Sequence, residues 1–237
     1  MENITRREIK YLLTNAQFTA LMHDLDARII PNKYSQQTIH NIYFDNARNT
    51  VLLRSLEQKE FKDKLRARVY EMDGILSPIF VELKKKFEDI SYKRRLTIDK
   101  EQSLASLIDF HTRLTSTGEQ AELSQIESEI ADFIKAYNAH PKTYIGYDRN
   151  SYKAKDAEEL RFTFDRNIRV RTENIGFHSD ATDAHLIPIA SYILEIKCGL
   201  PAYPLWLVKI LSAHQIYPSS FSKYTKAFES GLIPVSN

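Results

Sequence analysis

Successive segments of this sequence alternate between charged and apolar side chains, and this alternation limits the folds that the chain can adopt. In residues 62–70, KDKLRARVY, every second position carries a cation: Lys62, Lys64, Arg66 and Arg68. The positions between them include Leu65, Ala67 and Val69. A period of two predicts a β-strand that buries one face and leaves the other polar. Neighbouring cations on such a face lie about 7 Å apart and repel by roughly 0.6 kcal/mol in water, so the pattern indicates a solvated face or a bound anion.

The same alternation recurs along the chain and is interrupted by segments with helical spacing. Strands are expected at residues 7–13, 38–46, 62–72, 78–89, 90–99, 142–152, 159–171 and 191–199. Helices are expected at 16–29, 49–60, 103–111, 122–138 and 204–214, the first capped by Thr14 or Asn15. Residues 172–186 indicate a long polar loop or lid. The sequence therefore predicts one α+β domain over residues 1–237, with a helical insertion near 101–140.

Two architectures are compatible with strands that each have one charged face. In the first, a sheet or sandwich turns its apolar faces inward and exposes its charges to water. In the second, the sheet closes into an antiparallel β-barrel tunnel with a charged interior, and helices pack on the outside. Such an interior requires water and a polyanion, because unpaired buried charge is prohibitive. The acids Glu8, Glu82 and Glu195 would then hold a divalent metal. Periodicity alone leaves both architectures open.

Composition narrows the classes of function. The formal net charge is only +2, so a basic site has to be built by segregating charge, and nucleic acid is not an expected partner. With six glycines there is no glycine-rich phosphate loop, and the seven histidines lack zinc spacing. The lone Cys198 rules out an internal disulfide and fits a reducing compartment. No apolar run is long enough to span a membrane and the N-terminus does not resemble a signal peptide, so we expect a cytoplasmic protein.

Short segments in a fairly specific order carry a resemblance to a known group. They are REIKY, IYFDN, KLRARVY, FVELKKK, SYKRR, YIGYDRNSY, LRFTFD, YILEIK and FSKYTKA, and they cover nearly the whole chain. Together they resemble the triphosphate tunnel metalloenzymes, and within them the polyphosphate polymerase domain of the vacuolar transporter chaperone (VTC) family. The resemblance implies a tunnel barrel that binds a nucleoside triphosphate such as ATP with Mn2+ or Mg2+. It also implies transfer of the terminal phosphoryl group to a growing polyphosphate chain.

The resemblance implies roles for individual residues. The expected catalytic cations are Lys223, Arg66, Arg68 and Lys84. The expected phosphate-binding residues are Lys10, Lys93, Tyr147, Arg149, Arg161 and Ser222, together with Lys64 from the alternating strand. Glu195 is the expected metal-binding acid, with Glu8 as its companion.

One departure from the group's pattern bears on the reaction. Hydrolytic and cyclising members begin with an ExExK strand, whereas the matching positions here are Arg6, Glu8 and Lys10. The replacement of the first acid by a cation suits the polymerase branch. Hydrolysis of triphosphate or polyphosphate, and non-catalytic binding of these anions, are the alternatives. Eukaryotic relatives carry membrane spans in other domains, and a membrane-protein partner of this chain is unknown.

Overall fold

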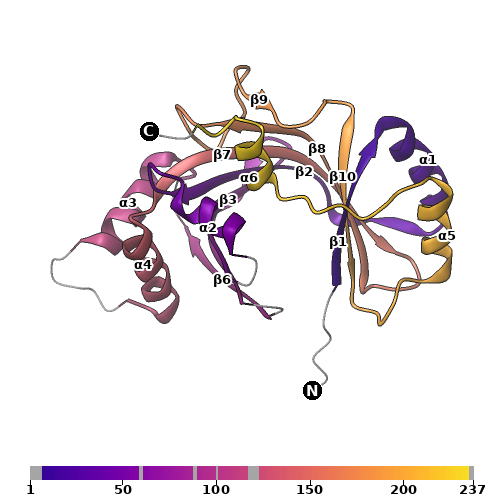
Figure 1. Ribbon diagram of the computed structural model, residues 1–237, viewed down its shortest axis with the longest axis horizontal. Helices are drawn as coiled ribbons and strands as arrows, with labels where there is room; N and C mark the ends of the chain where they lie inside the picture. Colours follow the sequence, from indigo (N-terminus) through magenta and orange to yellow (C-terminus); the bar gives the residue numbers. More distant parts are fainter. Residues whose placement is uncertain (1–6, 59–60, 88–89, 100, 117–122, 235–237) are drawn as a thin grey trace. The chain divides into compact units, whose positions relative to one another are not determined.

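The structure is a computed structural model that describes residues 7–58, 61–87, 90–99, 101–116 and 123–234 (Figure 1). Arg6 therefore lies outside the described residues. The chain divides into two compact units. Unit 1 comprises Met1–Thr38, Tyr147–Ile168 and Ile187–Ser222, and unit 2 comprises Ile39–Gly146, Arg169–Leu186 and Lys223–Asn237.

The described residues form ten strands of an antiparallel sheet and six helices, so the predicted α+β class is confirmed. The strands are β1 (Arg7–Thr14), β2 (Ile29–Asp45), β3 (Phe61–Met72), β4 (Ile75–Leu76), β5 (Ile79–Phe87), β6 (Ile90–Ile98), β7 (His140–Ala154), β8 (Leu160–Arg171), β9 (Ala184–His185) and β10 (Ser191–Cys198). The helices are α1 (Asn15–Leu25), α2 (Thr50–Glu57), α3 (Leu104–Thr115), α4 (Gln125–Tyr137), α5 (Leu205–Ala213) and α6 (Lys223–Glu229). The strand order is β1-β10-β8-β7-β2-β3-β5-β6, with β4 beside β3 and β9 beside β8. Closure of this sheet into a barrel with a charged interior stays a prediction, as does the single-domain organisation.

In unit 1, helices cover the apolar face of the strands. Tyr11, Leu194 and Phe164 lie opposite one another across β1, β10 and β8, and all three side chains are buried. They share a hydrophobic core with residues of α1 and α5, which lie beside these strands in Figure 1. Alternation then places Lys10 and Glu195, an opposed pair, on the other face. The predicted segregation of charge is therefore present in unit 1.

The ends of α1 and α5 show how local sequence sets this layer. Thr14 caps α1 with a capping box formed with Gln17, so the first of the two expected caps is the correct one. The guanidinium of Arg28 lies 4.9 Å from the centre of the Trp206 ring on α5, a cation–π contact.

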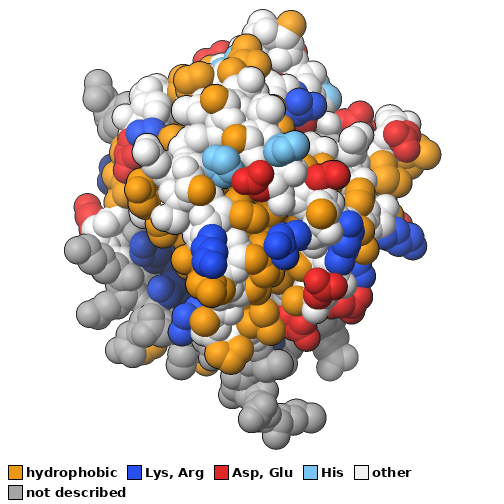
Figure 2. All heavy atoms as spheres, turned by 90° about the vertical axis from the view of Figure 1, so that its right-hand side faces the viewer, with side chains coloured by type: hydrophobic (Ala, Val, Ile, Leu, Met, Phe, Trp, Pro, Cys, Tyr) orange, Lys and Arg blue, Asp and Glu red, His pale blue; other side chains and the backbone are white. Residues whose placement is uncertain are grey.

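Figure 2 views the molecule from the side of α1 and α5 and shows apolar side chains among charged ones. Leu205 and Val208 of α5 are among the exposed apolar residues.

Unit 2 has the same organisation. Ala67, Val81 and Leu96 lie opposite one another across β3, β5 and β6 and belong to a core that includes residues of α3 and α4. These two helices lie between β6 and β7 in the chain, and Figure 1 shows them together beside β6. The neighbouring positions Arg66 and Glu82 therefore lie on the face away from this core.

Two segments differ from a simple reading of the sequence. β2 begins at Ile29, well before the expected residue 38. The sequence pattern missed this start because the first half of the strand is mostly polar and exposed and lacks the alternation of a half-buried strand. Residues 172–186 are irregular apart from β9, but Phe177 is buried in the core of unit 2. Arg171 holds this segment through Asp183, with an Nη1–Oδ1 distance of 2.6 Å. The segment is thus part of the core packing of unit 2. Within the described residues, no helix combines the length and apolar character needed to span a membrane.

Candidate functional site

A buried carboxylate lies at the centre of the charged face of unit 2. The register places Glu82 on β5 between Arg66 on β3 and Arg95 on β6. The Nε atoms of Arg66 and Arg95 each donate to Glu82 at 2.9 Å, and the Lys93 ammonium lies 2.8 Å away. Arg68 approaches to 3.9 Å, and the Glu82 side chain is only 2% exposed. Burial raises the pKa of Glu82, but the surrounding cations outweigh burial and hold this pKa far below its usual range.

Next to this cluster, three lysines form a row across the strands. Lys64, Lys84 and Lys93 occupy directly opposed positions on β3, β5 and β6. Opposed side chains have Cβ atoms about 5 Å apart, and like charges in that position are destabilising. Lys84 is exposed, and the Lys93 ammonium contacts Glu82. The row therefore concentrates positive charge where a polyanion would relieve the repulsion.

Three residues that were not among the predicted site residues, Asn41, Tyr43 and Tyr70, contact the arginines of this face. Arg68 donates through Nε to Asn41 Oδ1 at 2.9 Å and through Nη1 to the Tyr70 hydroxyl at 3.2 Å. Arg66 donates to the Tyr43 hydroxyl at 3.4 Å. Burial raises the pKa of Tyr43, but nearby cations, Arg66 first, outweigh burial and lower this pKa below its ordinary value. Alternation in HNIYFD places Asn41 and Tyr43 opposite the core residues Ile42 and Phe44, so the signal was present in the sequence.

Helix α6 packs against β2, the strand that carries Asn41 and Tyr43, through an aromatic residue. The Tyr224 ring stacks on Tyr43 with centroids 4.5 Å apart, and its hydroxyl donates to Asp45 Oδ2 at 3.0 Å. Asp45 also accepts hydrogen bonds from two backbone amides at the start of α2. Lys223 is the first residue of α6, so this attachment fixes where the helix that carries it begins. Ser222, the residue before α6, belongs to unit 1.

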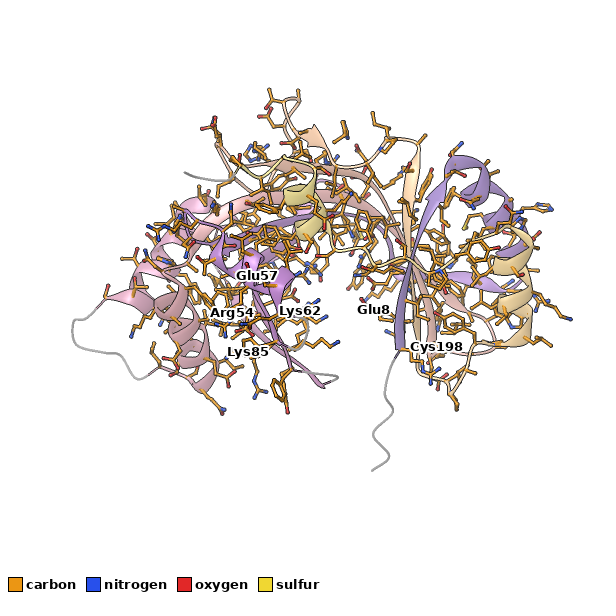
Figure 3. All side chains as sticks on the ribbon, viewed as in Figure 1. Glu8, Arg54, Glu57, Lys62, Lys85 and Cys198 are labelled. Carbon is orange, nitrogen blue, oxygen red and sulfur yellow. The ribbon has the colours of Figure 1, made fainter. Side chains whose placement is uncertain are left out.

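In unit 1, two carboxylates and two lysines alternate across β1 and β10. The register places Lys10 opposite Glu195 and Glu8 opposite Lys197. Lys197 lies 2.9 Å from Glu195 and 3.8 Å from Glu8, and Lys10 lies 3.9 Å and 3.7 Å from the same two acids. Burial raises the pKa of Glu195, but Lys197, Arg149 and Lys10 outweigh burial and lower it to about 2. Figure 3 labels Glu8, on this charged face, and Cys198, whose side chain belongs to the core on the other face.

The remaining predicted residues of unit 1 lie on β7 and β8. Arg149 donates to both carboxylate oxygens of Asp165, from Nε at 2.6 Å and from Nη2 at 2.8 Å. Its guanidinium also lies 5.3 Å from the centre of the Tyr147 ring. Burial alone would lower the pKa of Arg149, but Asp165 and then Tyr147 raise it well above its ordinary value. Arg161 is exposed, lies opposite Lys197 and donates to the Glu158 carbonyl at 3.3 Å.

A short C-terminal segment of unit 1 runs along β1 beside the carboxylates. The Ser219 amide donates to the Lys10 carbonyl at 2.7 Å, and the Lys10 ammonium donates to the Phe221 carbonyl at 3.2 Å. Glu8, Lys10 and residues 218–221 line a pocket of about 390 Å³. Lys10 therefore has its backbone and its ammonium group fixed by different parts of one segment.

The chemistry of Glu8 and Glu195 fits a divalent ion that arrives with a phosphate ligand. Among the described residues, no group of three or more His, Cys, Asp or Glu side chains could hold a metal by itself. Mg2+ commonly uses one or two carboxylates and completes its shell with water and substrate phosphates. Two neighbouring acids on a face with lysines supply such a partial set, whereas Glu82 is enclosed by four cations.

The chain matches one protein family and resembles solved structures. A family model described as the VTC domain matches residues 5–231. The fold resembles that of the PH1819 protein from Pyrococcus horikoshii OT3, with 12% identity, a TM-score of 0.53 and coverage of 95% of this chain and 99% of that one. It also resembles that of HpAC1 from Hippeastrum, a putative adenylyl cyclase described as having a dominant triphosphatase activity. That likeness has 20% identity, a TM-score of 0.51 and coverage of 96% of this chain and 97% of that one. No curated protein matches this sequence.

Proposed function

This chain belongs to the VTC domain family, and we propose that it is a metal-dependent polyphosphate polymerase that uses a nucleoside triphosphate. The family membership expected from the short sequence segments is confirmed. The reaction and the residues that perform it are the proposal. The observation that carries it is the charged face of unit 2, where cations from two strands, β3 and β6, gather around one buried acid on the strand between them.

The cations of unit 2 support a role in binding phosphate chains. Arg66 and Arg68 are oriented by Glu82, Tyr43, Asn41 and Tyr70, and an arginine fork offers five N–H donors that suit phosphate oxygens. The lysine row of Lys64, Lys84 and Lys93 supplies further point charges. We assign Lys223, at the start of α6, to the same group. Dense positive charge is needed because donor and acceptor of the phosphoryl group are both polyanions.

The carboxylates of unit 1 support a role for a divalent ion. Glu195 and Glu8 would hold Mn2+ or Mg2+ together with substrate phosphates. When bound, this ion would neutralise part of the phosphate charge. Glu195 stays ionised at neutral pH because its pKa is about 2. We assign Lys10, Arg149, Tyr147, Arg161 and Ser222 to phosphate binding in this unit.

The proposed step is a phosphoryl transfer in which one P–O bond breaks and another forms. The bond between the terminal phosphorus and the oxygen that bridges it to the next phosphate breaks, and a nucleoside diphosphate leaves. A terminal oxygen of the polyphosphate chain forms the new bond to that phosphorus. Such transfers depend on positioning and charge stabilisation more than on a covalent catalyst. Lysine and arginine donors aimed at non-bridging oxygens supply that stabilisation.

Two observations favour polymerisation over hydrolysis as the reaction. Arg6 stands where hydrolytic relatives of this pattern have the first acid of an ExExK strand. The positive surplus on unit 2 also suits a second phosphate chain as the acceptor in place of water. Hydrolysis in the same site and binding without turnover are the competing functions.

The test is to incubate the purified protein with ATP and Mn2+ and to resolve the products on a gel. Long-chain polyphosphate is the expected product, and excess chelator should stop its formation until Mn2+ or Mg2+ is restored. Free phosphate alone would make the protein a hydrolase, and steeply salt-dependent binding without turnover would make it a binding module. Either result would overturn the proposal.

Matched variants locate the activity on the predicted face. Arg66→Ala and Lys223→Ala should abolish polymer formation. Arg94→Ala is the control, because Arg94 pairs with Glu129 at 3.2 Å and lies on the opposite face of β6 from Arg95. Undiminished polymer with Arg66→Ala, or equal loss with Arg94→Ala, would contradict the assignment.

A further inference from the structure

We propose that Glu82 is a positioning residue, which aims the cations of two flanking strands at a linear phosphate chain and does not bind the metal. This inference rests on the proposed function, because it assigns a task within the same site. Glu82 is also one of the three acids that the sequence pattern indicated as possible metal ligands.

The contacts of Glu82 divide between its two oxygens. Oε2 accepts from Arg66 and faces Arg68, and both of these arginines belong to β3. Oε1 contacts Arg95 and Lys93, both of which belong to β6. A single acid on the central strand therefore connects the cations of the strand on each side. Because both oxygens are occupied by cations and the side chain is 2% exposed, little of the carboxylate remains for a metal ion.

Further contacts restrict the same arginines at other atoms. Arg68 donates through Nε to Asn41 and through Nη1 to Tyr70. Arg66 donates through Nε to Glu82 and through Nη1 to Tyr43. Each guanidinium is thus held at more than one nitrogen, which restricts its orientation. Donors fixed before the substrate arrives require no reorganisation during reaction.

The charge balance explains why one acid is compatible with anion binding. Four cations surround one carboxylate, so the cluster keeps a surplus of positive charge. Removing the carboxylate would increase that surplus and free the cations to spread apart. Affinity for anions in general should then be preserved, whereas the geometric match to one particular anion should be lost. A residue needed only for folding would not separate these two effects.

The experiment compares Glu82→Gln with the wild-type chain by calorimetric titration of linear tripolyphosphate and of cyclic trimetaphosphate. In the variant, the preference for the linear over the cyclic anion should fall by about tenfold, while affinity for the cyclic anion does not fall. In the polymerase assay, kcat should fall by about tenfold or more with KM changed by less than about threefold. The matched control is Glu129→Gln, which removes an acid that pairs with Arg94 on the opposite face of β6 and should change neither readout.

Several results would overturn the positioning role. An unchanged linear preference in Glu82→Gln would do so, and so would loss of Mn2+ affinity, since that loss would identify a metal ligand. If Glu82→Gln does not fold, the double variant Glu82→Gln/Arg95→Gln removes one charge of each sign and keeps the measurement possible, with the same expected loss of linear preference. If the wild type binds the linear anion preferentially but makes no polymer, the polymerase proposal fails while the positioning role is still decided by the titrations.

Discussion

Replacing the central lysine of the row across unit 2 should stabilise the protein and weaken its binding of polyanions. Lys84 lies on β5 directly between Lys64 on β3 and Lys93 on β6. The variant Lys84→Gln keeps a polar side chain of similar reach and removes the charge. Two repulsions are relieved at once, so stability and binding should change in opposite directions.

The magnitude follows from the spacing of the strands. Two ammonium groups about 7 Å apart repel by roughly 0.6 kcal/mol in water. Along β5, Glu82 and Lys86 flank Lys84 at equal spacing with opposite charges, so their effects largely cancel. The two cross-strand pairs together give about 1 kcal/mol at low ionic strength, which corresponds to a rise in Tm of about 2–4 °C. In 1 M salt the Debye length falls to about 3 Å, and the gain should disappear.

The binding of tripolyphosphate should weaken in the same variant. A charged hydrogen bond contributes about 1.5–3 kcal/mol, so loss of one ammonium predicts an affinity reduced by about tenfold or more. Thermal unfolding at low and high salt, together with calorimetric titration of tripolyphosphate, measures both effects on one preparation.

Lys85→Gln is the matched control, one residue away on the opposite face. Lys85 lies opposite Asp63, and its charge lowers the pKa of Asp63, although burial, the larger effect, raises that pKa overall. Lys85→Gln should therefore reduce stability slightly and leave tripolyphosphate affinity close to that of the wild type. A Lys84→Gln protein that is less stable than the wild type at low salt, or that binds tripolyphosphate equally well, would refute the reasoning.

Three further predictions test other contacts. The folded pKa of Glu195, about 2, lies below its ordinary value, so its stabilisation is complete above about pH 5 and is lost as pH falls toward 2; urea unfolding of Glu195→Gln should show a smaller loss between pH 7 and 3 than the wild type shows. Tyr224→Phe removes a buried hydrogen bond to Asp45 and should reduce the free energy of unfolding by about 1–3 kcal/mol, and an unchanged denaturant midpoint would contradict this. Asp183→Asn leaves Arg171 without its buried counter-charge and should cost about 3–5 kcal/mol, while tripolyphosphate affinity at a temperature where the variant is folded should match the wild type; a large loss of affinity would instead indicate a lid.

The faces of the strands could be predicted from the sequence because alternation requires no knowledge of distant partners. The positions of Leu65, Ala67 and Val69 in the core, and of Arg66 and Arg68 away from it, follow from a period of two. The start of α1 was equally accessible, since Thr14 and Gln17 form a capping box within four residues. Strand faces and helix caps can be predicted because the residues that determine them lie close together in the sequence.

Register between strands could not be predicted, and register decides which charges meet. Whether Glu82 faces Arg66 or Lys64 depends on how β3 and β5 are paired, and a slip of two residues would exchange them without moving either to the other face. The same applies to Lys197, which is close to Glu195 and Glu8 only because of the pairing of β1 with β10. The early start of β2 was missed because half of that strand lacks any alternation. The functional roles assigned to these residues stay predictions.

The fluorescence of Trp206, which contacts Arg28, can be used to follow the unfolding of unit 1. Trp206 is the chain's only tryptophan, and it packs on the core of unit 1. Indole emission therefore monitors melting of that half selectively, whereas circular dichroism averages over every helix and strand. Coincident transitions by the two signals would mean that both halves unfold cooperatively, and separated transitions would reveal a partly unfolded intermediate.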